Sequence, residues 1–101
     1  MAVRFDWGPR KAASNLAKHG VSFELAQEAF KDTRAHVEID NRHDYDEERL
    51  IRLAMVGVRY LFVSYTERVS ARSGDEIIRI ISARKATPHE RRTYHEGQAT
   101  R

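Results

Sequence analysis

Cysteine is absent from this sequence of 101 residues, and only two prolines interrupt it. Without cysteine the chain can form neither a disulfide framework nor a thiolate metal site. No apolar run approaches the ~20 residues that a membrane-spanning helix needs, and the first residues contain no signal-peptide core. These absences favour a protein that folds around a hydrophobic core in the cytoplasm, without a membrane partner.

The common catalytic and metal-binding motifs are also missing. There is no glycine-rich phosphate loop, no Gly-x-Ser-x-Gly motif and no cysteine nucleophile, which argues against P-loop nucleotide hydrolysis and acyl transfer. None of the five histidines forms a His-x-x-x-His pair, and the acidic segment 40–51 does not match a calcium loop. We therefore expect no metal ion and no other cofactor. The remaining polar side chains suit acid–base catalysis and the stabilisation of phosphate charge.

The composition is that of one globular domain with a strongly charged surface. Hydrophobic residues make up 41% of the chain and charged residues 33%, and this length suffices for one core but not for two. Acidic residues dominate 38–48, whereas basic residues dominate 1–20 and 79–101. Such blocks are typical of a surface for phosphate or for an acidic partner, although a solvated surface produces them too. We expect one domain over residues 1–101, with a flexible tail at about 97–101.

Two short helices are expected in the first third of the chain, after a short extended piece at 5–7. Pro9 suits the first turn of a helix that ends at Gly20, and Leu16 with the neighbouring alanines has helical spacing. Ser22 then offers an N-cap for a second helix with an apolar face.

The middle of the chain alternates with period two and predicts four strands, at 34–40, 49–56, 59–69 and 77–86. Short connections, including a reversal near Gly57, favour an antiparallel meander. Thr87, Pro88 and Glu90 form the capping box of a C-terminal helix, in which Tyr94 is the obvious packing side chain. The expected fold is therefore α+β, with two N-terminal helices packed on a four-stranded, largely antiparallel sheet and a short C-terminal helix.

Arginines in the last two expected strands are candidate ligands for an anion. Strict alternation puts Arg79 and Arg84 on opposite faces, so both reach one phosphate only if the strand bulges near 82–83. Arg68 shares a face with Tyr60 and further aromatic and polar residues. Arginine binds phosphate through its planar fork, and a neighbouring aromatic ring can stack on a base. The alternative is that these arginines pair with acidic residues on a solvent-exposed face.

Four separated segments together resemble one known family. They are "NLAKHGVSF", "HDYDEER", "VSYTER" and "RIISARKAT", in this order, within a similarity that extends over about residues 5–95. With these segments the sequence resembles the BrnT family of toxins from bacterial type II toxin–antitoxin modules. It departs from the family in "GPRK" after Trp7 and in the leucine after "EER", neither of which touches the basic cluster on which the functional inference depends.

The resemblance implies a RelE-like fold and a ribonuclease toxin that cleaves RNA, on or off the ribosome, and inhibits translation. It also implies a BrnA-like antitoxin partner with a ribbon-helix-helix domain, so that DNA is contacted only through the antitoxin. Carried onto the matching motif positions, the resemblance implies a site formed by Arg68, Arg79, Arg84, Lys18 and His19. Tyr94 joins this site by topology, because relatives of the fold use a residue of the C-terminal segment.

The expected chemistry is metal-independent cleavage, in which a 2′-hydroxyl attacks the adjacent phosphate while the strand arginines stabilise the developing charge. His19 or Glu48 would be the base and Lys18 or Tyr94 the acid, although Glu48 also fits a solvated acidic loop. Further cations are expected to bind RNA, namely Lys85, Arg91 and Arg92. Two other hypotheses remain open: a non-catalytic nucleic-acid-binding regulator that uses the same basic face, and a module that docks an acidic peptide.

Overall fold

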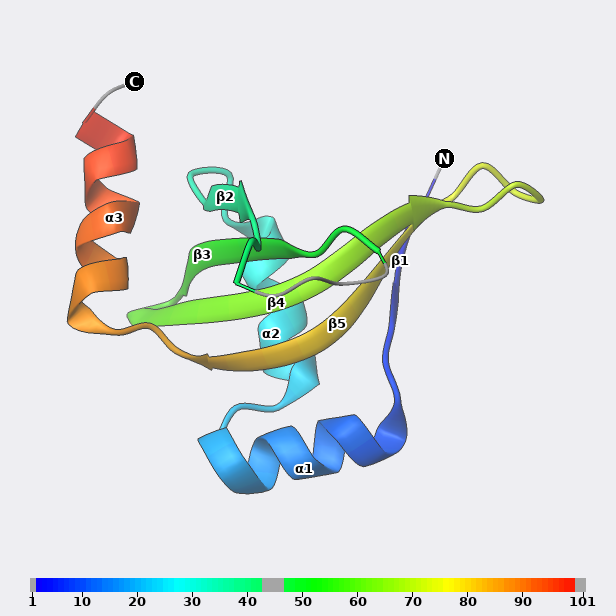
Figure 1. Cartoon of the computed structure of the whole chain (residues 1–101), viewed down its shortest axis with the longest axis horizontal. Helices are drawn as coiled ribbons and strands as arrows, with labels where there is room; N and C mark the ends of the chain where they lie inside the picture. Colours follow the sequence, from blue (N-terminus) through cyan, green and yellow to red (C-terminus); the bar gives the residue numbers. More distant parts are fainter. Residues whose placement is uncertain (1, 43–46, 100–101) are drawn as a thin grey trace.

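The structure is a computed structural model that describes residues 2–42 and 47–99. Within these residues, five strands form one sheet. The strand order across the sheet is β1-β5-β4-β3-β2 (Figure 1). The elements in chain order are β1 (Val3–Asp6), α1 (Pro9–His19), α2 (Phe23–Glu28), a 3-10 turn (Ala29–Lys31), β2 (His36–Ile39), β3 (Leu50–Val56), β4 (Arg59–Val69), β5 (Glu76–Lys85) and α3 (Pro88–Ala99).

The antiparallel meander is confirmed for β2, β3, β4 and β5, but the prediction of four strands was wrong. The short extended piece at the start of the chain is a fifth strand, β1, which pairs in parallel with β5 from Val3 opposite Glu76 to Asp6 opposite Arg79. A strand of four residues has little pattern of its own. Its partner lies far along the chain, so local sequence could not show the pairing.

The N-terminal helices cover one face of the sheet, and the predicted helix signals are confirmed. Pro9 begins α1, and Gly20 ends it with a φ of 70°, a conformation that favours glycine. The Ser22 side chain accepts a hydrogen bond from the backbone N–H of Leu25 at the start of α2. Buried side chains of these helices, such as Phe23, pack with Leu61 and further residues of β4 and β5 in the main core cluster.

The buried side of α1 differs from the expected one, because Leu16 is 50% exposed and Asn15 is 8% exposed. The Asn15 amide accepts from the backbone N–H of Ala83 at 3.1 Å and donates to its carbonyl at 2.8 Å. It also donates to the carbonyl of Val21 at 2.9 Å. Ala83 pairs with Val63 of β4 on one side, but because β1 ends at Asp6, no strand lies beside Ala83 on the other side of β5. Asn15 therefore takes the place of a strand partner, and buried polar backbone groups require one.

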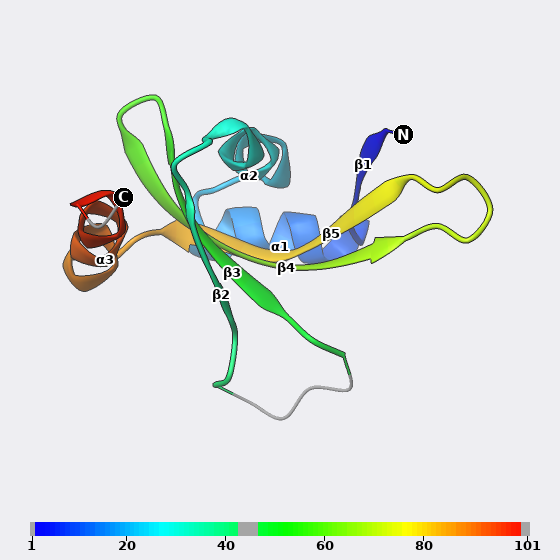
Figure 2. The same ribbon diagram turned by 90° about the horizontal axis from the view of Figure 1, so that it is seen from above.

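The opposite face of the sheet, on which α3 packs, is called the α3 face. It carries Phe62 and Thr66 of β4, which alternate with the core residues of the other face. Phe62 forms a second buried cluster with Ile51 and Leu53 of β3 and with Tyr94 of α3. Figures 1 and 2 show α3 at one end of the molecule and the turn between β4 and β5 projecting at the other end.

A β-bulge changes the sides on which the β5 arginines lie. Ser64 pairs with Ser82, whereas the next residue, Tyr65, pairs with Ile80, so Ile81 is an extra residue on β5. Arg84 consequently lies opposite Phe62, and Arg79 lies opposite Thr66. Both arginines are on the α3 face. Strict alternation assigned them to opposite faces of a regular strand, and the bulge considered as the alternative near 82–83 is present one residue earlier, at Ile81.

The remaining expectations concern the ends of elements and the membrane. No helix in the described ranges is long and apolar enough to span a membrane. α3 continues to Ala99, so residues 97–99 of the expected tail are helical. Residues 100–101, and residues 43–46 of the acidic loop, lie outside the described residues.

Candidate active site

A pocket of about 700 Å³ lies on the α3 face, between the sheet and the first turns of α3. Its floor is apolar and includes Phe62. Its walls are charged and include Arg42 after β2, Arg84 at the end of β5, and His89 and Glu90 on α3. The pocket therefore brings together cations and a histidine from segments that are far apart in the sequence.

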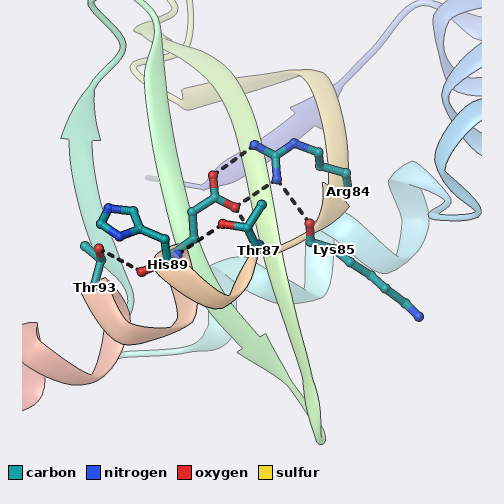
Figure 3. Close-up of polar contacts among 6 residues, drawn as sticks. Arg84, Lys85, Thr87, His89 and Thr93 are labelled. Carbon is teal, nitrogen blue, oxygen red and sulfur yellow. Dashed lines mark hydrogen bonds and ion pairs between the residues drawn. The ribbon is translucent and has the colours of Figure 1, made fainter.

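Arg84 is held on three sides. Its Nη1 and Nη2 atoms donate to the two carboxylate oxygens of Glu90 at 2.8 and 2.9 Å, and Nη1 also donates to the carbonyl of Lys85 at 3.1 Å (Figure 3). The guanidinium carbon lies 3.9 Å from the centre of the Phe62 ring. A guanidinium stacked on an aromatic ring and paired through two hydrogen bonds has a fixed plane and a fixed direction.

Glu90 holds Arg84 and caps α3 at the same time. Its Oε1 atom accepts from the backbone N–H of Thr87 at 2.8 Å, and its own N–H donates to the Thr87 hydroxyl at 3.2 Å. The predicted capping box is thus confirmed. Burial alone would raise the pKa of Glu90, but the hydrogen bonds from Arg84 and Thr87 outweigh it and lower the pKa below the ordinary value. Glu90 is therefore ionised at neutral pH.

A second guanidinium, that of Arg42, lies 5.2 Å from the centre of the Phe62 ring. Its Nε and Nη2 atoms each donate to a carboxylate oxygen of Asp40 at 2.8 Å, and Asp40 is 4% exposed. Arg42 is not among the residues that the sequence motifs indicate. Its place beside the Phe62 ring depends on how the segment after β2 packs on the α3 face, which no local pattern shows.

His89 is another side chain of the pocket that the sequence motifs do not indicate. It follows Pro88 in the first turn of α3 and lines the same pocket as Arg84. The Thr93 hydroxyl donates to the His89 carbonyl at 3.2 Å one turn later (Figure 3). The capping box could have indicated the place of His89, because a residue between Thr87 and Glu90 must lie near the partner of the Glu90 side chain. Within residues 2–42 and 47–99, no histidine belongs to a cluster that could hold a metal ion.

Residues 7–90 match the family model described as ribonuclease toxin, BrnT, of type II toxin-antitoxin system. The chain belongs to the BrnT family. The family resemblance seen in the sequence is thereby confirmed, and membership implies an antitoxin partner. No curated protein matches the chain.

Arg79 of this BrnT chain lies on the α3 face but outside the Arg84 pocket. The partners of the two arginines lie four positions apart on β4, a distance of about 13 Å along the strand. Nη1 of Arg79 donates to Asp6 of β1 at 2.8 Å, and both side chains are nearly half exposed. The bulge therefore brings the two arginines to one face without bringing them to one pocket.

Arg68 lies near the other end of β4, opposite Ile77. It lines a separate pocket together with Val3 and other residues of β1, β4 and the following turn. It lies six positions from Phe62 on β4, a distance of about 20 Å. In this BrnT chain, Arg68 and Arg84 are not brought together.

Lys18 and His19 lie in the last turn of α1. They line a shallow pocket of about 190 Å³ next to Ile81 and Ser82 at the bulge of β5. Glu48 is exposed in the segment that leads into β3. None of these three side chains lines the Arg84 pocket as far as the described residues define it.

Tyr94 is 5% exposed, and its hydroxyl donates to Asp32 at 2.8 Å. Burial and this hydrogen bond raise the pKa of Tyr94 to about 12. The same carboxylate oxygen accepts from the backbone N–H of Met55 on β3. This arrangement anchors α3 to the sheet, in agreement with the packing role expected from its position in the helix.

The three cations expected to bind RNA lie in different places. Lys85 pairs with Leu61, a core residue of the helix-covered side of the sheet, and Figure 3 shows its side chain extending away from Arg84. Arg91 lies over the ring of Tyr60, 4.5 Å from its centre, at the α3 end of the sheet. Arg92 is exposed on α3.

Proposed function

We propose that this chain is a metal-independent endoribonuclease whose active site is the Arg84 pocket. The observation that carries this proposal is that a preoriented guanidinium and a histidine line one open pocket. Family membership supports it, since the family is described as a ribonuclease toxin. The proposed substrate is a phosphodiester of single-stranded RNA, either in solution or in mRNA on the ribosome.

The proposed reaction begins with attack of a ribose 2′-hydroxyl oxygen on the adjacent phosphorus. His89 accepts the hydroxyl proton while the new oxygen–phosphorus bond forms. Arg84 stabilises the negative charge that develops on the phosphate oxygens, as preoriented donors do in other active sites. The bond from phosphorus to the 5′ oxygen then breaks, and that oxygen takes a proton from water in the open pocket. The hydroxide that remains takes the proton from His89, which restores both the water and the base. The products are a 2′,3′-cyclic phosphate end and a 5′-hydroxyl end.

We assign the proton transfers to His89 and to water, because the other candidate residues either lie outside the pocket or already use their proton in a hydrogen bond. Tyr94 already donates its hydroxyl proton to Asp32 and has a pKa of about 12. Glu48, Lys18 and His19 lie outside the pocket in the described residues. We propose that Lys18, His19 and Arg79 contact RNA beside the bulge, and that Arg91 and Arg92 contact it along α3.

We further propose that RNA cleavage inhibits translation in the cytoplasm and that a BrnA-like antitoxin with a ribbon-helix-helix domain blocks it. The antitoxin would contact operator DNA and cover the α3 face. A RelE-like fold, as the family resemblance implies, accords with helices on one face of an antiparallel sheet and a catalytic pocket on the other.

Purified protein should cleave RNA in EDTA, without and with ribosomes, and leave cyclic-phosphate ends. His89→Ala should lower kcat at least about 100-fold, since proton transfer by a positioned side chain contributes roughly 10²–10⁴. The matched control is Arg72→Ala. Arg72 is an exposed residue of the turn between β4 and β5, at the other end of the molecule from α3. The RNA-cleaving activity of Arg72→Ala should equal that of the unmodified protein.

Two results would contradict the proposal. Intact RNA that is shifted on a gel, with binding that weakens steeply as salt rises, would indicate a non-catalytic regulator. Full activity of His89→Ala at equal folded protein would remove His89 from the mechanism.

A further inference from the structure

We propose that Glu90 is a positioning residue, which locks one edge of the Arg84 guanidinium so that the other edge is presented to a phosphate. The inference rests on the proposed function, because it assigns a phosphodiester as the ligand. It adds a residue whose place in the capping box alone would suggest only a structural role.

Arg84 has more hydrogen-bond donors than its contacts within the protein use. A guanidinium carries five N–H donors, which form two flat edges and a single remaining N–H. Glu90 occupies the edge formed by Nη1 and Nη2, and the Lys85 carbonyl takes the second Nη1 hydrogen. In the described part of the chain, the Nε–H and the second Nη2–H of Arg84 make no hydrogen bond.

These two remaining donors are parallel, because the Nε–H and one Nη2–H of arginine point in the same direction within the guanidinium plane. Two parallel N–H groups match two oxygens of a phosphate. In Figure 3 this edge of Arg84 faces away from the residues to which Arg84 is bonded. The contacts of Arg84 thus use one complete edge and leave the other complete edge for a ligand.

The position of this edge is over-determined by its surroundings. Phe62 fixes the plane of the guanidinium at 3.9 Å, and Glu90 fixes its rotation within that plane. The Glu90 carboxylate is in turn held by the backbone N–H at position 87, which does not depend on the threonine side chain. A displacement of about 1 Å can cost roughly 100-fold in rate, so the carboxylate that aims Arg84 should matter to the reaction itself.

Arg79 shows what an arginine on the same face has without such support. It makes one contact with Asp6 at 2.8 Å, and its side chain is 44% exposed. The side chain of Arg84 is 30% exposed and that of Glu90 is 19% exposed. Partial burial strengthens the ion pair of Arg84 relative to the exposed pair of Arg79.

The test is the substitution Glu90→Gln, which keeps an oxygen for the Thr87 N–H but removes the charged two-oxygen partner of Arg84. We expect kcat for RNA cleavage to fall about 10- to 100-fold, with KM within about twofold and little change in Tm. The control Thr87→Ala removes the hydroxyl contact of the cap but keeps the carboxylate on Arg84. It should lower Tm and leave kcat within about twofold.

A second readout follows Arg84 directly. The ¹⁵N–¹H signal of its Nε, assigned by its loss in Arg84→Lys, should be sharp in the unmodified protein. It should shift when an uncleavable RNA with a 2′-deoxy substitution at the cleavage site is added. In Glu90→Gln the signal should broaden, and the RNA should shift it only at higher concentration.

The outcomes separate the two proposals. Unchanged kcat and an unchanged Nε signal in Glu90→Gln would overturn the positioning role and leave the ribonuclease intact. If the unmodified protein cleaves no RNA but the Nε signal shifts with RNA and weakens in Glu90→Gln, the proposed reaction fails and the positioning role stands. No shift of the Nε signal by RNA in the unmodified protein would overturn both.

Discussion

Arg84 and Arg79 lie on one strand and one face of the sheet, but their surroundings differ in almost every respect. Arg84 is stacked on Phe62, paired through two hydrogen bonds with Glu90, and lines a pocket beside α3. Arg79 has one ion pair, with Asp6, on an exposed part of the face. The comparison teaches that a motif such as "RIISAR" predicts which residues are cationic, whereas the packing around each cation decides what it can do.

The largest expected difference is in catalysis. Arg84→Ala should lower kcat about 10²–10³-fold, the usual cost of losing a preoriented donor. Arg79→Ala should cost less than about tenfold, because an exposed cation with one partner contributes mainly to RNA binding. Single-turnover cleavage at saturating RNA measures both. Equal losses would show that the two arginines act at one phosphate and would break the comparison.

The next effect concerns the bulge that lies between the two arginines. Asn15→Ala leaves the N–H and carbonyl of Ala83 and the carbonyl of Val21 without their buried partner. We expect the free energy of unfolding in urea to fall by about 1–3 kcal/mol. Ser14→Ala, one position away on the exposed side of α1, is the matched control. A loss below about 0.5 kcal/mol, the range of ordinary surface substitutions, would mean that the edge of β5 at Ala83, next to the bulge, needs no support from α1.

A smaller effect is expected at the anchor of α3. Tyr94→Phe removes the hydrogen bond to Asp32 and should lower the free energy of unfolding by about 0.5–1.5 kcal/mol at pH 8. The folded-state pKa of Tyr94 is about 12 against an ordinary value of 10.0. A raised pKa means that the contribution is fully present below pH 10 and is lost as the pH rises toward 12. Urea unfolding of both proteins at increasing pH should therefore show that the difference in their free energies of unfolding becomes smaller. A difference that stays constant would contradict the hydrogen bond from Tyr94 to Asp32 as its source.

The smallest effect is expected at the partner of Arg79. Asp6→Asn should change the free energy of unfolding by less than about 1 kcal/mol, because both charges of the pair are nearly half exposed. The effect should decrease further at high salt. A larger, salt-independent loss of unfolding free energy in urea would show that β1 depends on this pair. The ion pairs of Arg79 and Arg84 would then be more alike in strength than their exposure indicates.

Local signals in the sequence were sufficient for many elements of the fold. The capping box of Thr87 and Glu90, the end of α1 at Gly20 and the meander of four strands depend on neighbouring residues, and all are present. The packing role of Tyr94 also followed from its place in an otherwise polar helix.

What the sequence could not show depends on contacts between distant segments. β1 is a strand only because Glu76 and the following residues lie beside it. The bulge at Ile81 reverses the face that alternation assigns to one of the two arginines. Two residues further along β5, the backbone of Ala83 is bonded to Asn15 from another element. Within the candidate site, Arg84 and Glu90 were visible as residue types, but their pairing over Phe62 required the packing of β4 against β5 and α3.

The parallel pairing of β1 with β5 also has a consequence for how the chain folds. Residues 3–6 have no strand partner until residues 76–79 have been synthesised. The pocket needs residues 84–90 as well. Contacts between such distant segments raise the contact order and slow folding. On the ribosome, most of this sequence must therefore emerge before the pocket can form, so a partially synthesised chain is expected to have no ribonuclease activity.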